Sequence, residues 1–271
     1  MSVQLERVSF RYPGAAFDAL REVTFECAPG CVHLVTGRLG AGCSTLLQVI
    51  AGLAPHVTGG SRSGSVVTLG RDPAGSERHD LAGRIGLLLP TPWTQLSGMA
   101  YTVAEEVAFG PANLGWDRER IRQAVDEALR LVALERVAAR DPRTLSGGEL
   151  QRVMFAAVIA MDPEVCLLDE PAMELDPAGA EALYAHLPVL ARERTVILAT
   201  TDLDRAVSAA GRVILLDGGA VIGDGNPAEI LGTPRAVETG ATTTVARIAS
   251  LAGADLTYPL TVAAAVERFS R

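Results

Sequence analysis

Two continuous apolar runs constrain the fold of this chain more than any other feature. They read "VCLLD" at residues 165–169 and "TVILATT" at residues 195–201, and a segment with helical spacing, 177–194, separates them. Neither run alternates apolar with polar residues, which is typical of strands buried on both faces of a parallel sheet. The chain is therefore predicted to be an α/β protein with a mainly parallel sheet core.

The spacing of apolar residues divides the rest of the chain. The N-terminal part holds short β-branched runs separated by Pro and Gly, which predicts an antiparallel β part. Residues 55–64 carry Gly and Ser and predict a loop. From about residue 90 to 160 the spacing is helical, which predicts an inserted helical subdomain. We expect residues 1–225 to form one domain and residues 226–271 to form a small C-terminal helical appendage.

Composition and charge limit the class of protein. The chain has 271 residues, of which 48% are hydrophobic, so it can bury a full core. Its longest apolar run, Val153–Met161, is roughly half the length of a membrane span, and no charged-then-apolar leader begins the chain. We therefore expect a cytoplasmic protein with no transmembrane segment or signal peptide. A net charge of −8 argues against nucleic acid as a partner.

Cys27 and Cys31 flank a turn, and we interpret them as strand residues rather than as a metal pair.

A glycine-rich loop, "TGRLGAGCSTLL" at residues 36–47, joins a predicted strand to a predicted helix. Backbone N–H groups and the helix dipole attract anions there, and glycines let a phosphate approach closely. The hydroxyl of Ser44 is placed to contact Mg²⁺. A lysine normally precedes this serine, and because Cys43 stands there, the loop alone fits a structural turn equally well. The candidate nucleotide-binding residues of the loop are Gly37, Arg38, Leu39, Gly40, Ala41, Gly42, Cys43, Ser44 and Thr45.

Two acidic residues follow a buried strand in "CLLDEP". Asp169 and Glu170 come at its carboxyl end, where open α/β sheets bind ligands. Asp169 suits a contact with Mg²⁺ through water, and Glu170 suits polarising an attacking water. Either residue alone also fits a solvated acid at a strand end. Together, about 120 residues after the glycine loop, they favour a nucleotide site.

A third motif, "LSGGELQRV" at residues 145–153, predicts the start of a helix. Ser146 is its N-cap, and Glu149 follows three residues later, which completes a capping box. Gly147 and Gly148 cost about 1 kcal/mol each relative to Ala in a helix. Helix capping explains the serine and the glutamate but not the two glycines, which suggests that this helix start must come close to an anion.

Together these residues resemble the nucleotide-binding subunits of ABC transporters, over roughly residues 2–225. "LSGGE", residues Leu145, Ser146, Gly147, Gly148 and Glu149, resembles the family signature. "LLDEP" and "LDP" (167–177) resemble the Walker B and D-loop segments, the latter with Asp176. The resemblance implies the fold of a P-loop NTPase, the cofactors ATP and Mg²⁺, Mg²⁺ ligation by Ser44 and Asp169, and a catalytic role for Glu170. It also implies that Tyr12 stacks on adenine.

A finer resemblance points to the ATPases of energy-coupling-factor importers, which take up vitamins or transition-metal ions. It rests on "TVAEEVAFGPANLG" (102–115), on "QL" (95–96) and on "YPLTVAAAVERF" (258–269). The implied assembly has two ATPases, a transmembrane coupling subunit and a substrate-binding membrane subunit. The implied location is the cytoplasmic face of the cell membrane, as a peripheral subunit.

Three positions depart from the family pattern. Cys43 stands in place of the Walker A lysine, Pro90 in place of the Q-loop glutamine, and Thr201 in place of the switch histidine. Cysteine supplies no cation for phosphate, proline has no side-chain donor or acceptor, and threonine is shorter and uncharged. A helix start also favours ionisation of the Cys43 thiol, which would oppose phosphate binding. We therefore expect this chain's own site to bind nucleotide weakly and to be deficient in hydrolysis.

The geometry of the family gives these losses a role. By this resemblance, two subunits pair head to tail, and each ATP lies between the glycine loop of one subunit and the signature of the other. The intact "LSGGE" can then complete the site of a competent partner, and we expect a heterodimeric ATPase in which this chain is the degenerate subunit. Two other hypotheses are a non-catalytic regulatory nucleotide-binding module and a soluble ABC ATPase that acts on DNA or ribosomes. The intact signature disfavours the first, and the acidic charge disfavours the second.

Overall fold

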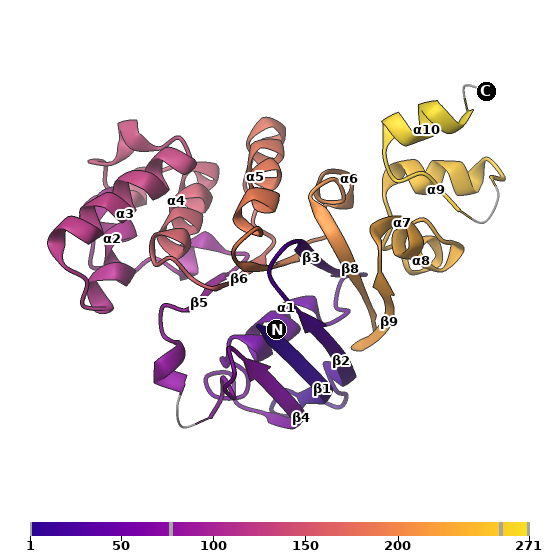
Figure 1. Ribbon diagram of the computed structural model, residues 1–271, viewed down its shortest axis with the longest axis horizontal. Coiled ribbons are helices and arrows are strands. Elements are labelled where there is room, and N and C mark those ends of the chain that lie inside the picture. Colours follow the sequence, from indigo (N-terminus) through magenta and orange to yellow (C-terminus); the bar gives the residue numbers. More distant parts are fainter. Residues whose placement is uncertain (1, 76–77, 255–256, 270–271) are drawn as a thin grey trace.

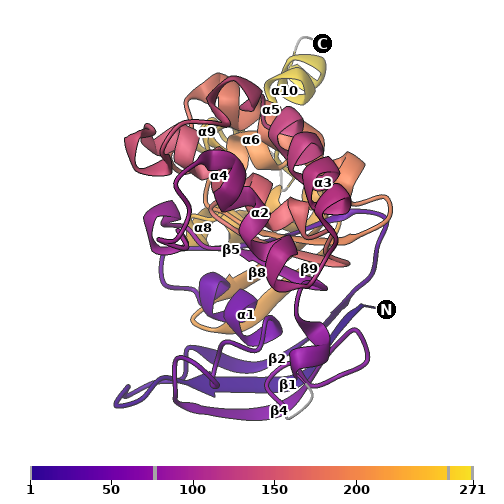
Figure 2. The same cartoon turned by 90° about the vertical axis from the view of Figure 1, so that its left-hand side faces the viewer.

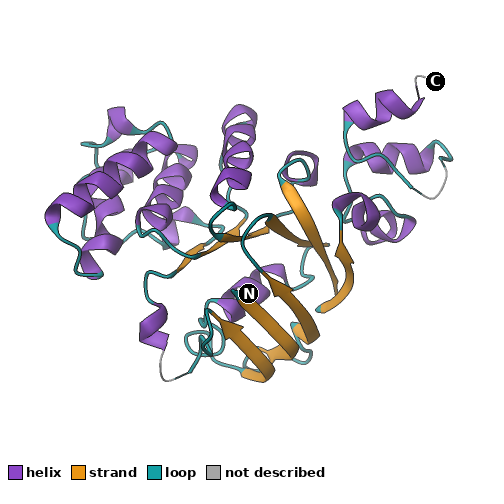
Figure 3. Ribbon diagram, in the orientation of Figure 1, coloured by secondary structure: helices purple, strands orange, loops and turns teal. Residues whose placement is uncertain are grey.

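A computed structural model describes residues 2–75, 78–254 and 257–269. The strands form two sheets, and the helices lie between and above these sheets (Figures 1 and 3). The strands are β1 Val3–Arg11, β2 Leu20–Cys27, β3 Val32–Gly37, β4 Ser61–Thr68, β5 Ile85–Leu88, β6 Val165–Asp169, β7 Thr195–Ala199, β8 Ala210–Asp217 and β9 Ala220–Gly225. The α-helices are α1 Cys43–Ile50, α2 Val103–Asn113, α3 Arg118–Leu131, α4 Gly147–Ala160, α5 Pro177–Leu190, α6 Leu203–Ala206, α7 Pro227–Leu231, α8 Pro234–Thr239, α9 Thr244–Leu251 and α10 Val262–Phe269. Short 3₁₀ turns are η1 Arg78–Leu81, η2 Pro92–Thr94, η3 Glu135–Val137 and η4 Pro142–Thr144.

The central sheet has the strand order β5-β6-β7-β3-β8-β9, and its strands run parallel except for β9. Every residue of β3, β6 and β7 is buried, which confirms the interpretation of the continuous apolar runs as strands covered on both faces. The register is level at the carboxyl ends, because Ala199 pairs with both Val35 and Asp169. The loops that leave these strands therefore meet at one edge of the sheet.

The second sheet is antiparallel, with the order β2-β1-β4, and it confirms the predicted N-terminal β part. Helix α1 lies between this sheet and the central sheet, as Figure 2 shows, and a shared hydrophobic cluster joins the three elements. The strand β4 begins earlier than the sequence predicts. Residues 61–64, expected in a loop, belong to this strand, and residues 61–63 pair with β1, since the free edge of that strand supplies partners that a polar local sequence does not reveal.

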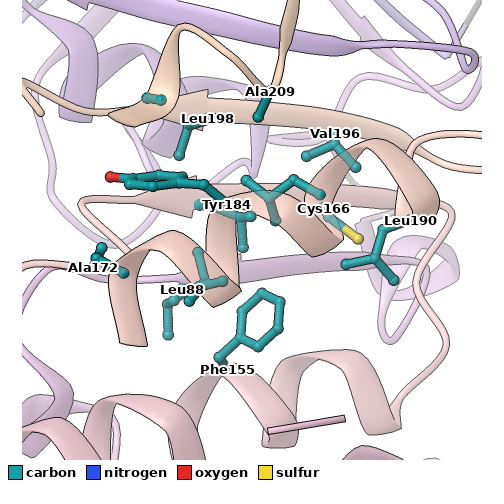
Figure 4. Packing of buried hydrophobic residues seen from close by; sticks show 14 of the residues in the cluster. Leu88, Phe155, Cys166, Ala172, Tyr184, Leu190, Val196, Leu198 and Ala209 are labelled. Atoms are coloured by element: carbon teal, nitrogen blue, oxygen red, sulfur yellow. The ribbon is translucent and has the colours of Figure 1, made fainter. Parts of the chain in front are cut away.

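Helices α2, α3 and α4 pack on one another and form the predicted helical block, at the opposite end of the molecule from the C-terminal helices (Figure 1). A second hydrophobic cluster joins this block to the central sheet. In it Phe155 of α4 and Tyr184 of α5 pack with residues of β5, β6 and β7 (Figure 4). The predicted α/β fold, with its mixed, mostly parallel sheet, antiparallel N-terminal sheet and helical subdomain, is therefore confirmed.

The C-terminal residues are helical, as expected. Leu231 of α7 and Ala236 of α8 are fully buried, and α7 contacts β8 and β9. Helix α10, in contrast, buries none of its residues. None of the helices within the described ranges is both long enough and apolar enough to cross a membrane.

Candidate functional site

A cavity of about 330 Å³ lies at the carboxyl edge of the central sheet. It is formed by the glycine loop after β3, by the ends of β6 and β7, and by the N-terminal sheet. The structure thus brings together the predicted loop residues, the acidic pair, Tyr12 and Thr201, although they are far apart in the sequence. The lining residues are Tyr12, Ala19, Gly37, Arg38, Leu39, Gly40, Ala41, Gly42, Cys43, Ser44, Thr45, Asp169, Glu170, Ala199, Thr200 and Thr201.

The glycine loop is shaped by close backbone contacts. A Cβ atom at Gly37 would lie 2.3 Å from the carbonyl oxygen of Leu216, and one at Gly42 would lie 2.6 Å from that of Ala19. Gly42 also has a φ of 106°, in the left-handed region that favours glycine. Helix α1 begins directly after it, with no side-chain cap and no acidic residue in its first turn. Its first N–H groups are therefore available to an anion.

Ser44 and Asp169 form the predicted oxygen pair. The Ser44 hydroxyl donates a hydrogen bond of 3.1 Å to Oδ1 of Asp169. Asp169 is 2% exposed, and burial raises its pKa to about 6, with a smaller increase from the charge of Glu170 and an opposing effect of the Ser44 hydrogen bond. A carboxylate beside a hydroxyl at the start of α1 fits the oxygen ligands that Mg²⁺ prefers.

Cys43 behaves differently from the sequence expectation. Its pKa is raised to about 12, mainly by burial and further by the charges of Asp169 and Glu170. The thiol is therefore neutral at pH 7, and the prediction that a helix start would favour its ionisation is wrong. The physical reason is that Cys43 packs against the cluster between the two sheets and faces two carboxylates. Desolvation and like charge outweigh the helix dipole.

Among the described residues that line the cavity, Arg38 is the single basic side chain. Its Nε lies 2.8 Å from Oδ1 of Asp217, at the end of β8. Phosphate binding in this cavity would thus draw on backbone N–H groups, on any metal ion that accompanies the ligand, and on an arginine that is shared with Asp217.

Glu170 is held by the two threonines that follow β7. Its Oε1 accepts hydrogen bonds from the Thr201 N–H (2.8 Å) and the Thr201 hydroxyl (3.0 Å). Its Oε2 accepts one from the Thr200 hydroxyl (2.7 Å). Thr200 also accepts a hydrogen bond from the Asp202 N–H (3.1 Å) and lies 3.3 Å from the Tyr184 hydroxyl. Thr200 was not predicted as a site residue, and its only signal in the sequence is its place directly after a buried strand.

Tyr12 lies at the cavity with its hydroxyl fixed to helix α1. That hydroxyl donates to Oε1 of Gln48 (3.3 Å) and lies 3.1 Å from Oγ1 of Thr45, while the ring meets Phe10 edge-on at 4.9 Å. The helix therefore orients the ring beside the glycine loop. Adenine stacking by Tyr12 remains a prediction.

Pro90 follows β5 at the same edge of the sheet but does not line the cavity among the described residues. A nearby glutamine has a structural task instead. Gln95 accepts a hydrogen bond from the Leu89 N–H (2.7 Å) and donates one to the Leu87 carbonyl (2.9 Å). These bonds close the loop that leaves β5.

The "LSGGE" segment forms the N-terminus of α4, apart from the cavity, and Ser146 is its exposed residue. The capping box is present: Ser146 accepts from the Glu149 N–H (3.3 Å), and Glu149 accepts from the Ser146 N–H (2.9 Å). A Cβ atom at Gly148 would lie 2.9 Å from the backbone oxygen of Glu174, so this glycine has a packing reason that the sequence did not give. A Cβ atom at Gly147 would meet only the carboxylate end of that residue, at 2.7 Å.

Asp176, predicted in the D-loop, lies just beyond Glu174. Its carboxylate caps helix α5 by accepting a hydrogen bond of 2.8 Å from the Gly179 N–H. The segment after β6 thus connects Glu170 in the cavity with the start of α4.

Comparison with known proteins agrees with this arrangement. The ABC transporter family matches residues 20–173, more than half of the chain. A Methanosarcina acetivorans ABC transporter ATP-binding protein is 41% identical over 231 residues, which cover 84% of this chain and 37% of that protein. The chain thus spans well under half the length of this relative.

Solved structures share the fold. The chain resembles cbiO1 from Clostridium perfringens, part of the ABC transporter complex cbiONQ, with a TM-score of 0.73 and 28% identity over 93% of this chain and 98% of that one. It also resembles the dimeric ATP-binding cassette MJ0796 bound to ADP and Pi, with a TM-score of 0.71 and 24% identity over 83% and 98% of the two chains. On the sequence match, the fold and the glycine-loop cavity, the chain belongs to the ABC transporter family of ATP-binding proteins.

Proposed function

We propose that the chain is the degenerate nucleotide-binding subunit of an energy-coupling-factor-type importer, paired with a different ABC ATPase whose own site performs hydrolysis. One contrast carries this proposal. Cys43 and Thr201 line the same cavity as Glu170, so two substitutions fall on one site. The "LSGGE" segment, in contrast, keeps all its residues and presents Ser146 at an exposed helix start.

The cavity residues suit binding more than hydrolysis. The glycine loop and the first turn of α1 offer N–H groups to phosphates. Ser44 and Asp169 would hold Mg²⁺, which when bound neutralises part of the phosphate charge. Glu170 has both carboxylate oxygens engaged by Thr200 and Thr201, which competes with its use as a base for water. Hydrolysis would further lack a cation from residue 43.

The proposed partners follow from the resemblance and from the cbiO1 structure, which belongs to a multisubunit transporter complex. They are a second ABC ATPase subunit, a transmembrane coupling subunit and a substrate-binding membrane subunit. In this assembly the chain lies at the cytoplasmic face of the membrane, as a peripheral subunit. The membrane subunits would select the transported vitamin or metal ion.

Purification of the native complex through an affinity tag on this chain tests the proposal. We expect a second ABC ATPase with an intact glycine-loop lysine to co-purify, and the complex to hydrolyse ATP. The isolated chain should release phosphate far more slowly than the roughly 1–100 s⁻¹ typical of phosphoryl-transfer enzymes. A complex that contains only copies of this chain, or an isolated chain with ordinary turnover, would contradict the proposal.

A further inference from the structure

The cavity has a basic side chain that comes from the glycine loop itself. Arg38 directly follows Gly37, the last residue of β3, and it lines the cavity. Its side chain is 63% exposed, so the guanidinium can reach a ligand without breaking a buried contact first. Because residue 43 is a cysteine, Arg38 is the one lining side chain in the described part of the chain that brings positive charge to a phosphate.

Strand pairing explains why Arg38 lies beside an aspartate. Gly37 of β3 pairs with Leu216 of β8, so the residues that follow them, Arg38 and Asp217, are neighbours. Nε of Arg38 lies 2.8 Å from Oδ1 of Asp217. That oxygen is buried and accepts no hydrogen bond from the described residues, so the contact is an ion pair without hydrogen-bond geometry. Ion pairs between exposed side chains contribute little to stability, and a phosphate can therefore compete for this arginine.

The terminal nitrogens of Arg38 suit a phosphate group. A guanidinium carries five N–H donors in a planar fork, and two of them can bind two phosphate oxygens at once. The four N–H groups on the terminal nitrogens have no acceptor among the residues that the structure describes. The Ala41 N–H donates to the Arg38 carbonyl (2.9 Å), which closes a turn and fixes the backbone that carries the side chain.

On the basis of the proposed nucleotide-binding role, we propose that Arg38 is the phosphate-binding residue that replaces the missing glycine-loop lysine. Its terminal N–H groups bind oxygens of the phosphate chain, while Asp217 retains Nε. Arg38 stands at the start of the loop, whereas residue 43 stands at its end and begins α1. The cation therefore supports binding of the nucleotide from another position, without restoring the lysine where hydrolysis requires it.

Calorimetric titration of the full chain with Mg²⁺-ATP tests this inference. Arg38→Gln should weaken ATP binding by about tenfold or more, because hydrogen bonds between charged groups are lost. Adding Cys43→Lys to this variant should return the affinity to within about threefold of wild type, since it supplies a cation at the other end of the loop. The matched control Arg21→Gln removes an exposed arginine of β2 that does not line this cavity, and it should change the affinity by less than about twofold.

Two further measurements separate a phosphate contact from a structural role of Arg38. The affinity of Arg38→Gln should fall less than that of wild type between about 0.05 M and 0.3 M NaCl, because one of the attracting charges has been removed. Asp217→Asn removes the carboxylate that competes for the arginine and should tighten ATP binding by about threefold. The same change should have no effect in the Arg38→Gln background.

Each outcome discriminates. Unchanged ATP binding by Arg38→Gln would overturn the inference and leave the proposed function standing. Weaker binding that Cys43→Lys does not rescue would show that Arg38 shapes the loop rather than binds phosphate, which also overturns the inference. Absence of ATP binding by the wild-type chain would overturn the proposed function as well. If Arg38→Gln does not fold, Asp217→Asn decides, because unchanged or weaker binding by that variant would contradict phosphate binding by Arg38.

Discussion

At the scale of single residues, burial sets the charge in the cavity more than the chemical identity of the side chains does. Cys43 and Asp169 both have raised pKa values, and burial is the largest cause for each. The thiol is therefore neutral, and the carboxylate titrates near neutral pH. A site of this kind changes its charge with pH at Asp169 rather than at Cys43.

The first prediction concerns Asp169 and pH. Its pKa is about 6 in the folded chain against 3.8 for an ordinary aspartate, so folding favours the protonated form. The stability that this group contributes is present below about pH 4 and is lost as pH rises through 6. Asp169→Asn should therefore gain free energy of unfolding relative to wild type across this window, by up to about 3 kcal/mol at pH 7. Urea unfolding at pH 5 and pH 7.5, with Glu193→Gln as control, measures the difference. A pH-independent difference would contradict the assignment.

The second prediction concerns Cys43. Cys43→Lys should raise nucleotide affinity by about tenfold or more, since a hydrogen bond to a charged group contributes roughly 1.5–3 kcal/mol. It should not restore turnover, because Glu170 stays bonded to Thr200 and Thr201, and groups that act as a unit are not repaired singly. Filter binding and phosphate release from the same preparation separate the two effects. Full activity from this single change would show that the threonines and Pro90 do not limit the site.

Motif spacing predicted which residues gather at this site but not how they bond. The glycine loop and the acidic pair could be placed at one sheet edge because parallel strands align their carboxyl ends. The hydrogen bonds of Glu170 depend on the register of β6 against β7, and the local sequence does not specify that register. The same limit explains the wrong expectation for the Cys43 thiol, because a helix-start rule carries no information about burial.

At the scale of elements, the bounds of fully buried strands follow the hydrophobic pattern of the sequence, and the bounds of strands at a sheet edge depart from it. β6 and β7 match their apolar runs, whereas β4 extends into polar residues because β1 offers it a partner edge. The start of α4 shows a similar dependence on a neighbour. Its two glycines look equivalent in the sequence but meet different atoms of Glu174.

The third prediction separates these glycines. Gly148→Ala would place a Cβ atom 2.9 Å from a backbone oxygen, so the segment after β6 must shift, and we expect a loss of about 1–2 kcal/mol. Gly147→Ala meets only a movable carboxylate and gains helix propensity, so it should be neutral or stabilising by up to about 1 kcal/mol. Thermal unfolding of both variants measures the order. The reverse order would mean that the Glu174 backbone is not the constraint.

At the scale of the whole molecule, the predicted nucleotide-site residues and the predicted signature residues lie on two separate surfaces. The cavity lies at the carboxyl edge of the central sheet, and Ser146 lies at the exposed start of α4 in the helical block. The sequence predicted both, together with the helical C-terminus, because each has a local pattern. The predicted domain boundary at residue 225 remains a prediction. Contacts with a partner depend also on the residues of the partner, and these residues are not part of this chain's sequence.

The fourth prediction addresses the proposed asymmetry between this chain's own nucleotide site and the site that its signature completes in the partner. In the native complex, Glu170→Gln alters the site proposed to be silent and should leave ATP hydrolysis and uptake largely intact. Ser146→Arg adds bulk at the helix start proposed to complete the partner's site, and it should lower both activities by about 10²-fold or more. Thr102→Arg is the matched control, because it disrupts the same kind of capping box at α2.

The most direct measurement is the steady-state ATPase rate of the purified native complex with each of these variants. An asymmetric pair of sites predicts near wild-type rates for Glu170→Gln and for Thr102→Arg, and loss of activity for Ser146→Arg. Equal damage from Glu170→Gln and Ser146→Arg would show that the two sites hydrolyse ATP equivalently, which contradicts a silent site in this chain.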